Sequence, residues 1–225
     1  MNDLDLEIPQ CVPVMTLRGV VLFPRAMMPL RIFEDRYRQM LDQCLSENRM
    51  FAIFAEREDV THEEEHLELS HPIGTIGLVR VSKKHDDGTS FVLLQGLRRV
   101  KIKSITQEHP YRILEVEAID SIIDDSMDHF RTQLSRELKR NMNLGGIVTN
   151  EMIEFLTPLE DNDAFVDLTA YSICQETLVK QTMLEENNLS ARTSMLLDEL
   201  TNENDRLTLV KEALDGNCEE DLGYN

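Results

Sequence analysis

The segment His62–His66, with the sequence HEEEH, matches the pattern H-E-x-x-H. On a helix this spacing places both imidazoles on one face, where they bind zinc while the glutamate acts as a general base. Glu68 or His71 could supply a third ligand. The segment lies, however, between two apolar, strand-like runs, and three consecutive carboxylates are costly to bury. We interpret it as a solvated acidic loop, with weak adventitious metal binding as an alternative, and predict no catalytic residue and no metal site.

Four basic side chains lie close together in the sequence, at Arg98, Arg99, Lys101 and Lys103. Clustered Lys and Arg favour binding to nucleic-acid phosphates. Two neighbouring predicted strands would, however, set the two lysines opposite Glu115 and Glu117, and no aromatic platform for base stacking accompanies them. We therefore expect no nucleic-acid partner and keep RNA binding as the alternative function. Both arginines remain candidate residues for binding a partner.

The segment PRAMMP, residues 24–29, places two methionines between two prolines. In a predicted loop, two adjacent side chains do not bury easily, and methionine suits adaptable binding surfaces. The alternative is that both methionines plug the end of a β domain or its interface with the helical part. We take Arg25, Met27 and Met28 as further candidate partner-binding residues.

Residues 1–120 are rich in strand patterns. The runs GTIGLVRVS and FVLLQG flank Asp87-Gly88, a typical hairpin turn. The segments RRVKIKSI and YRILEVEAI alternate apolar and charged residues, as half-buried strands do. One helix interrupts the strands, and its predicted core-facing stripe consists of Phe33, Tyr37, Met40, Leu41, Cys44 and Leu45. The sequence thus predicts an α+β fold that opens with a β domain carrying one inserted helix.

The patterns after residue 120 are helical, over residues 126–141, 150–157, 162–184 and about 191–214. The last helix has an apolar seam that we expect to pack within a helical bundle rather than in a coiled-coil dimer, formed by Leu196, Leu200, Leu207, Val210 and Leu214. We expect three parts: a β-rich domain at 1–120, an acidic helical bundle at 121–215 and a frayed tail at 216–225.

The net charge of −19 is unevenly distributed. Residues 1–120 carry 15 Lys and Arg against 20 Asp and Glu, whereas residues 121–225 carry 8 against 22. Such a field repels nucleic acid and anionic membranes at long range. The N-terminus does not resemble a signal peptide, no apolar run approaches the roughly 18–20 residues that span a bilayer, and the four cysteines form no C-x-x-C pair. We expect a cytoplasmic protein that has no membrane partner and no disulfide.

The segment Pro13–Leu45 closely resembles the opening of the N-terminal domain of Lon proteases. The family pattern is a strand L-R-x-x-V-L-F-P, then P-L-x-I-F-E-x-R-Y-x-x-M-L leading into a helix, matched here by Leu17, Arg18, Val21, Leu22, Phe23, Pro24, Pro29, Leu30, Ile32, Phe33, Glu34, Arg36, Tyr37, Met40 and Leu41. The runs GTIGLV, LLQGLRRVKI and PYRILEVE follow in the family's order, and KQTMLEENNLSARTSMLLDEL resembles its K-Q-x-L-L-E-x-x-D-L-x-x-R segment. The resemblance spans roughly residues 10–205. It implies a β pseudo-barrel, related to RNA-binding PUA domains, followed by a helical bundle.

In full-length Lon proteases this domain precedes an ATPase module and a Ser-Lys peptidase module. The 225 residues contain no G-x-x-x-x-G-K-[ST] phosphate loop and no recognisable Ser-Lys nucleophile. The resemblance therefore implies a free-standing domain of the substrate-binding type, without enzymatic activity and without a cofactor. Its expected partner is an unfolded or specific polypeptide, with a protease or chaperone among the candidates. The sequence specifies neither that polypeptide nor the oligomeric state.

Overall fold

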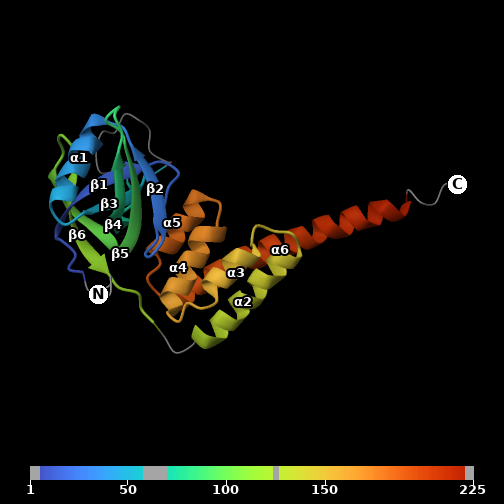
Figure 1. The fold of residues 1–225 in the computed structure, drawn as a ribbon. Helices are drawn as coiled ribbons and strands as arrows, with labels where there is room; N and C mark the ends of the chain where they lie inside the picture. The colour runs from blue at the N-terminus through green and yellow to red at the C-terminus, as the bar shows by residue number, and fades with distance from the viewer. Residues whose placement is uncertain (1–5, 58–69, 124–126, 221–225) are drawn as a thin grey trace. The chain divides into compact units, whose positions relative to one another are not determined.

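The structure is a computed structural model that describes residues 6–57, 70–123 and 127–220 (Figure 1). The segment HEEEH at 62–66 lies outside these residues. The chain forms two compact units: Met1–Asp120 with Gln175–Asn187, and Ser121–Cys174 with Asn188–Asn225. The division into domains at residues 120 and 215 stays a prediction.

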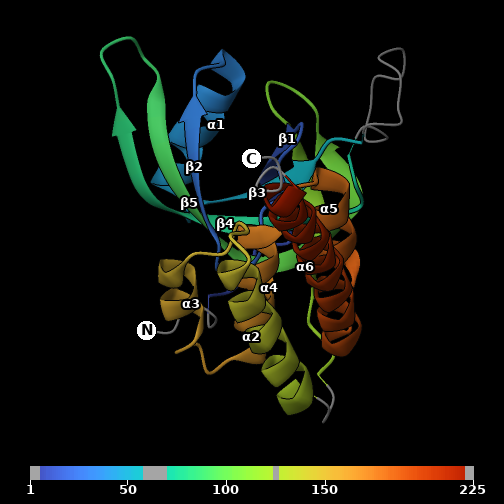
Figure 2. The same cartoon turned by 90° about the vertical axis from the view of Figure 1, so that its right-hand side faces the viewer.

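Six strands form one mixed sheet in the first unit: β1 Cys11–Leu17, β2 Met27–Ile32, β3 Met50–Ala55, β4 Ile73–Lys84, β5 Ser90–Gln107 and β6 Ile113–Ile119. Their order is β2-β5-β4-β3-β1-β6, and β5 also pairs with β6. This second pairing closes five strands into a ring, while β2 pairs only with the first half of β5, as an edge strand. Figure 2 shows β2 beside β5, and the β4–β5 hairpin projecting at the upper left. The predicted α+β fold with a β pseudo-barrel is confirmed.

The β4–β5 hairpin forms where the sequence predicts it. Its turn includes Asp87 and Gly88, and Gly88 has a φ of 81°, a conformation that glycine adopts without steric cost. The Asp87 side chain accepts hydrogen bonds from the Thr89 backbone N–H at 2.9 Å and from the Thr89 hydroxyl at 2.7 Å. These bonds stabilise the turn and so fix how β4 and β5 pair.

Along the edge strand β2, the backbone N–H and carbonyl groups of successive residues point alternately toward β5 and toward the unpaired edge of the sheet. The N–H of Gly96 donates to the carbonyl of Ala26 at 2.9 Å, which sets the alternation. The backbone groups of Met27, Pro29 and Arg31 therefore face away from β5. Proline lacks an N–H and is tolerated in sheets at such an edge.

The helix α1 spans Asp35–Ser46, close to the predicted position. Met40, Leu41 and Cys44 are buried, which confirms the core-facing stripe at these residues. Phe33 was expected in the same stripe, and that part is wrong. It lies before the helix N-cap Glu34 and is 62% exposed.

The helix α5, Thr177–Glu185, belongs to the first unit, far along the chain from the strands it contacts. The Nε of Arg99 on β5 donates to the Leu184 carbonyl at 3.1 Å, and the Nε2 of Gln181 donates to the Ile73 carbonyl at 2.9 Å. The predicted continuous helix over 162–184 is wrong. The chain is extended at Cys174 and Glu176, and α4 and α5 are separate helices.

The second unit is helical, with α2 Met127–Asn143, α3 Asn150–Leu156, α4 Asn162–Ile173 and α6 Leu189–Glu220. Gly145, with a φ of 77°, follows α2 where the sequence predicts a break. The Thr149 hydroxyl caps α3 and the Asp161 carboxylate caps α4. The distal part of α6 extends past the other three helices (Figure 1), and its Leu209, Val210 and Leu214 are exposed. The predicted seam is therefore buried only in its first part, at Leu196 and Leu200.

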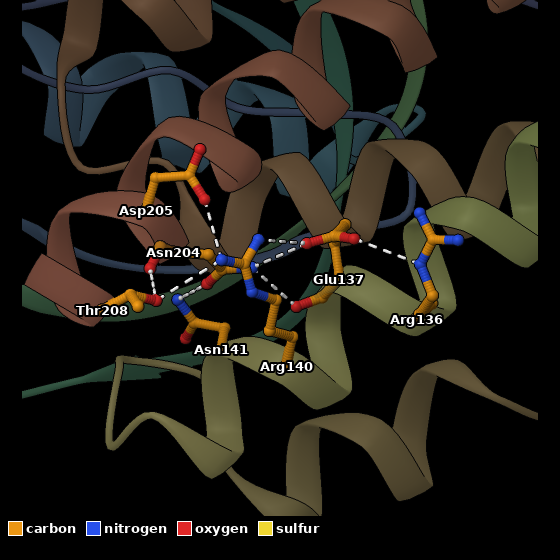
Figure 3. Close-up of polar contacts among 7 residues, drawn as sticks. All are labelled: Arg136, Glu137, Arg140, Asn141, Asn204, Asp205 and Thr208. Atoms are coloured by element: carbon orange, nitrogen blue, oxygen red, sulfur yellow. Dashed lines mark hydrogen bonds and ion pairs between the residues drawn. The ribbon is translucent and has the colours of Figure 1, made fainter.

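A polar cluster with a buried centre at Glu137, Asn141 and Asn204 joins α2 to α6 (Figure 3). The Asn141 amide donates to the Asn204 side-chain oxygen at 2.8 Å. The Asn204 amide in turn donates to the Glu137 backbone carbonyl at 3.0 Å and to its carboxylate at 3.2 Å. Arg140 extends the cluster to Asp205 at 2.8 Å. We call these five residues the α2–α6 polar cluster.

A second buried polar contact joins α4 to α6. Arg192 is fully buried, and its Nε lies 3.1 Å from an Asp167 oxygen. The guanidinium also contacts Asp163 and Ser121. Among the described residues, none of the helices is sufficiently long and apolar to span a membrane.

Candidate functional site

One side of β2, β5 and β4 carries three rows of side chains, because directly opposed residues of antiparallel strands point to the same side. The register gives the rows Met27–Gln95–Leu78, Pro29–Leu93–Val81 and Arg31–Phe91–Lys83. We call these nine residues the hairpin face. The alternate residues point to the other side, where Met28, Val79, Val92 and Leu94 are buried.

The hairpin face exposes large apolar side chains. Val81 is 56% exposed, Phe91 is 52% exposed and Met27 is 40% exposed. The basic side chains at Arg31 and Lys83 are also exposed and flank Phe91 in its row. Phe91 has an edge contact with the His85 ring at 5.0 Å between centroids. An exposed apolar patch with polar neighbours is typical of an interaction surface on a soluble protein.

The turn before β2 holds Met27 at the edge of this face. The Arg25 N–H donates to the Gly96 carbonyl at 2.7 Å, and Arg25 has a φ of 65°, which is strained for a residue with a Cβ. The backbone of Phe23 and Pro24 lies directly against Gly96, where a Cβ would collide with the Phe23 carbonyl. The missing side chain at Gly96 is therefore what lets this turn reach β5.

The two predicted methionines point in opposite directions. They were expected in a loop, but both belong to β2, so alternation exposes Met27 and leaves Met28 only 5% exposed, on the core side. Partner binding by these residues stays a prediction. A partner can reach Met27 in this arrangement, whereas Met28 acts as a core residue.

The predicted basic cluster does not form one surface. Arg99 is only 3% exposed and binds the Leu184 carbonyl, while Arg98 pairs with Asp120. Arg99 therefore shares no solvent-exposed surface with the two lysines, because α5 covers it. Arg25 and Met27 meet β5 at Gly96 and Gln95, so of the five candidates only these two lie together beside the hairpin face.

The predicted pairing of lysines with glutamates is confirmed for Lys101, which lies opposite Glu117. A bulge after Ile102 shifts the register, so that Ser104 rather than Lys103 lies opposite Glu115. Lys103 still reaches Glu117, at 3.6 Å between Nζ and Oε2. The continuous basic surface that RNA binding requires is thus interrupted by burial and by ion pairs.

The described residues contain no cluster of three or more His, Cys, Asp and Glu side chains arranged to hold a metal ion. Cys11 is exposed, and Cys44 and Cys174 are buried free thiols. Burial, with a smaller contribution from the Glu47 carboxylate, raises the pKa of Cys44 to about 12. Cys44 therefore stays protonated at neutral pH, which suits a packing role rather than that of a nucleophile.

The fold agrees with comparisons to known proteins. A family model for the substrate-binding domain of ATP-dependent protease La (LON) matches residues 11–202. The chain belongs to this family. The Lon substrate-binding family thus accounts for most of the residues in both units, as the resemblance implied.

Relatives of the chain include Lon proteases from several bacteria. The Lon protease of Desulfosudis oleivorans is 26% identical over 216 residues, which cover 93% of this chain and 26% of that protein. The Lon protease of Clostridioides difficile is 27% identical over 206 residues, which cover 88% of this chain and 26% of that protein. The chain therefore spans about a quarter of the length of these relatives.

Solved structures show the same fold in isolated Lon N-terminal domains. The N-terminal domain of a Mycobacterium avium complex Lon protease aligns with a TM-score of 0.68 and 18% identity, over 85% of this chain and 98% of that one. A Lon N-terminal domain protein from Xanthomonas campestris aligns with a TM-score of 0.63 and 20% identity, over 84% and 97%.

Sequence reasoning missed most of the hairpin face. Its central residues Val81, Leu93 and Phe91 were treated only as parts of apolar strand runs. A two-residue Asp87-Gly88 turn would pair Lys83 with Val92, but the structure has a three-residue turn at 86–88 that pairs Lys83 with Phe91 and Val81 with Leu93. The length of the turn decides the register, and because that length was not predicted, the rows could not be derived from the sequence.

Proposed function

We propose that the chain is a non-catalytic polypeptide-recognition module and that the hairpin face is the surface that binds. The observation that supports this most is the exposure of Val81, Phe91 and Met27 on one side of a sheet, in a domain of the Lon substrate-binding family. A location in the cytoplasm and the absence of a cofactor remain part of the proposal.

Binding would rest on burial of apolar surface. A polypeptide segment placed across the rows covers Val81, Leu93 and Pro29 with apolar side chains, and this contributes affinity in proportion to the area removed from water. Arg31 and Lys83 on the outermost row favour a segment with acidic residues at one end. Such contacts give broad rather than strict specificity, because they read size and polarity rather than a hydrogen-bond pattern.

The test is fluorescence anisotropy of a labelled, permanently unfolded polypeptide titrated with the protein at physiological salt. Val81→Asn and Met27→Asn each place a polar amide on the hairpin face, and we expect each to weaken binding about tenfold through lost apolar burial. Phe155→Asn is the matched control, because Phe155 is a similarly exposed apolar residue on α3. Met28→Asn would put the amide in the core and tests stability, not binding.

Unchanged affinity in both hairpin-face variants would contradict the proposed surface. The salt dependence separates polypeptide from RNA, because phosphate binding weakens steeply as salt rises while apolar docking does not. Mass spectrometry of the probe after incubation tests the non-catalytic role, and cleavage products that persist in highly purified protein would overturn it.

A further inference from the structure

The pairing of β1 with β6 stops part-way along β1. Cys11, Val12 and Pro13 pair with residues of β6, and the Val14 N–H donates to the Arg112 carbonyl at 3.0 Å. If the ladder continued in this register, the hydrogen-bonded pair after Val14 and Arg112 would be Thr16 and Pro110. Proline has no N–H to donate, so this ladder cannot continue in its regular form.

The backbone of Thr16 faces the side that β6 leaves open. The carbonyl of Leu17 accepts the Glu56 N–H of the segment following β3 at 2.9 Å, so Leu17 faces β3. Backbone groups alternate along a strand, and Thr16 therefore faces the same way as Val14, away from β3. Among the described residues, no backbone hydrogen bond is made to Thr16 from that side.

A cavity of about 550 Å³ lies at this point of the first unit. Its lining consists of Val14, Thr16, Arg36, Tyr37, Glu56 and residues 108–112. Its volume falls within the roughly 300–1,000 Å³ of typical ligand pockets. The open backbone groups of β1 thus border a space large enough to hold part of another chain.

Two arginines line the cavity, and they differ in their ion pairs. Arg36 pairs with Glu34 at 2.8 Å and lies over the Tyr37 ring at 4.6 Å from its centroid. Arg112 has no ion pair among the described residues. Burial raises the pKa of Tyr37, and both guanidinium groups oppose that rise, which places Arg112 near the phenol. Because Glu56 and Glu108 also line the cavity, a single carboxylate fits it better than a strongly acidic ligand.

We propose that this cavity receives an extended polypeptide segment that adds to β1 at Thr16 as a further strand and sets one acidic side chain against the Arg112 guanidinium. Strand addition of this kind takes affinity from backbone hydrogen bonds and specificity from pockets for alternate side chains. The inference rests on the proposed function in taking polypeptide as the ligand, but it uses a surface separate from the hairpin face.

Thr16→Pro tests the backbone contribution. It removes an N–H that faces away from β3, together with the side-chain hydroxyl, and prolines are accepted at such edges. Thr16→Val is the control, because it keeps the N–H and loses the hydroxyl that lies 3.1 Å from the Ser70 hydroxyl. The probe is a labelled peptide of about eight alternating Thr and Val residues with one central Glu, a composition that favours strands. We expect Thr16→Pro to weaken its binding about tenfold and Thr16→Val less than twofold.

Arg112→Gln tests the ionic contribution. It forms a double-mutant cycle with a second peptide that carries Gln in place of the central Glu. We expect the substitution to weaken the Glu peptide about fivefold and to leave the Gln peptide within twofold. Hydrogen exchange gives a measurement that does not depend on a variant, since bound peptide should slow exchange at the Thr16 amide of the wild-type protein.

The results separate this inference from the proposed function. If the peptide fails to bind at high micromolar protein, or if Thr16→Pro and Thr16→Val bind alike and the Thr16 amide is not protected, strand addition at β1 is wrong. The unfolded probe would still report on the hairpin face in that case. If Val81→Asn weakens the unfolded probe and Thr16→Pro leaves the Thr-Val peptide unaffected, the proposed function stands and this inference does not.

Discussion

Gly96 leaves no space for a side chain on the side where the Phe23–Pro24 backbone crosses β5. Gly96→Ala would push that turn away and disturb both the Arg25 N–H bond to the Gly96 carbonyl and the start of β2. We expect a loss of about 1–3 kcal/mol in the free energy of unfolding, the usual cost of overpacking. Chemical denaturation measures it, and Gln95→Ala on the adjacent, partly exposed position is the control. Equal stability of the two variants would show that the turn can move without cost.

Single residues also show where sequence patterns lose their meaning. Alternation along 98–103 places Arg99 with the lysines, on the side of the strand opposite Val100. Residues of α5, about 85 positions later, cover that side at Arg99, and no local pattern contains this contact. Met27 and Met28 were predicted to lie together in a loop, because the flanking prolines hid the strand. In the strand β2 their side chains point to opposite sides of the sheet.

At the level of elements, the sequence was most reliable where local chemistry decides the outcome. The Asp87-Gly88 turn and the α1 stripe at Met40, Leu41 and Cys44 were predicted from spacing alone. The break between α4 and α5 was not, because neither glycine nor proline marks Cys174–Glu176. Gln181 and Leu184 contact strands that are far away in the sequence. The periodicity of a helix does not reveal such contacts.

The pairing of α2 with α6 depends on an ionised side chain. Burial alone would raise the pKa of Glu137, but hydrogen bonds from Asn204, Arg136 and Arg140 outweigh it and hold that pKa below its ordinary value of 4.5. A depressed pKa in the folded state stabilises the fold above the unfolded-state pKa, and this contribution is lost as pH falls through the folded-state pKa.

Glu137→Gln should therefore be less stable than wild type at pH 7, by about 1–3 kcal/mol, because the carboxylate that accepts from Asn204 is replaced. The difference should shrink as pH falls below about 4.5. Thermal unfolding from pH 7 to pH 3 measures it, with Glu212→Gln on the exposed surface of α6 as the control. A stability difference that stays constant with pH would indicate that Glu137 contributes through packing and not through its charge.

For the whole molecule, the family and the order of elements could be predicted from sequence, because long ordered motifs such as residues 13–45 specify them. The candidate surfaces could not. The hairpin face arises from the register among three strands, and the Thr16 cavity from the place where β6 stops pairing with β1. Both surfaces depend on which segments lie together in the folded protein. A single sequence reveals such pairings only where a turn fixes the register.

The Pro29 position has a further consequence for how copies of this protein behave in a crowded solution. The backbone of Arg31 faces the outer edge of β2, and Pro29, two residues before it, has no N–H to donate there. Another β2 that approached in register would find this gap in its ladder, so growth of intermolecular sheets is opposed at the margin that also carries exposed apolar side chains. Pro29→Val should leave the fold intact yet make light scattering rise with time and concentration, while Pro72→Val, outside the strands, should not. A stable scattering signal from Pro29→Val would mean that charge repulsion at −19 suffices for colloidal stability.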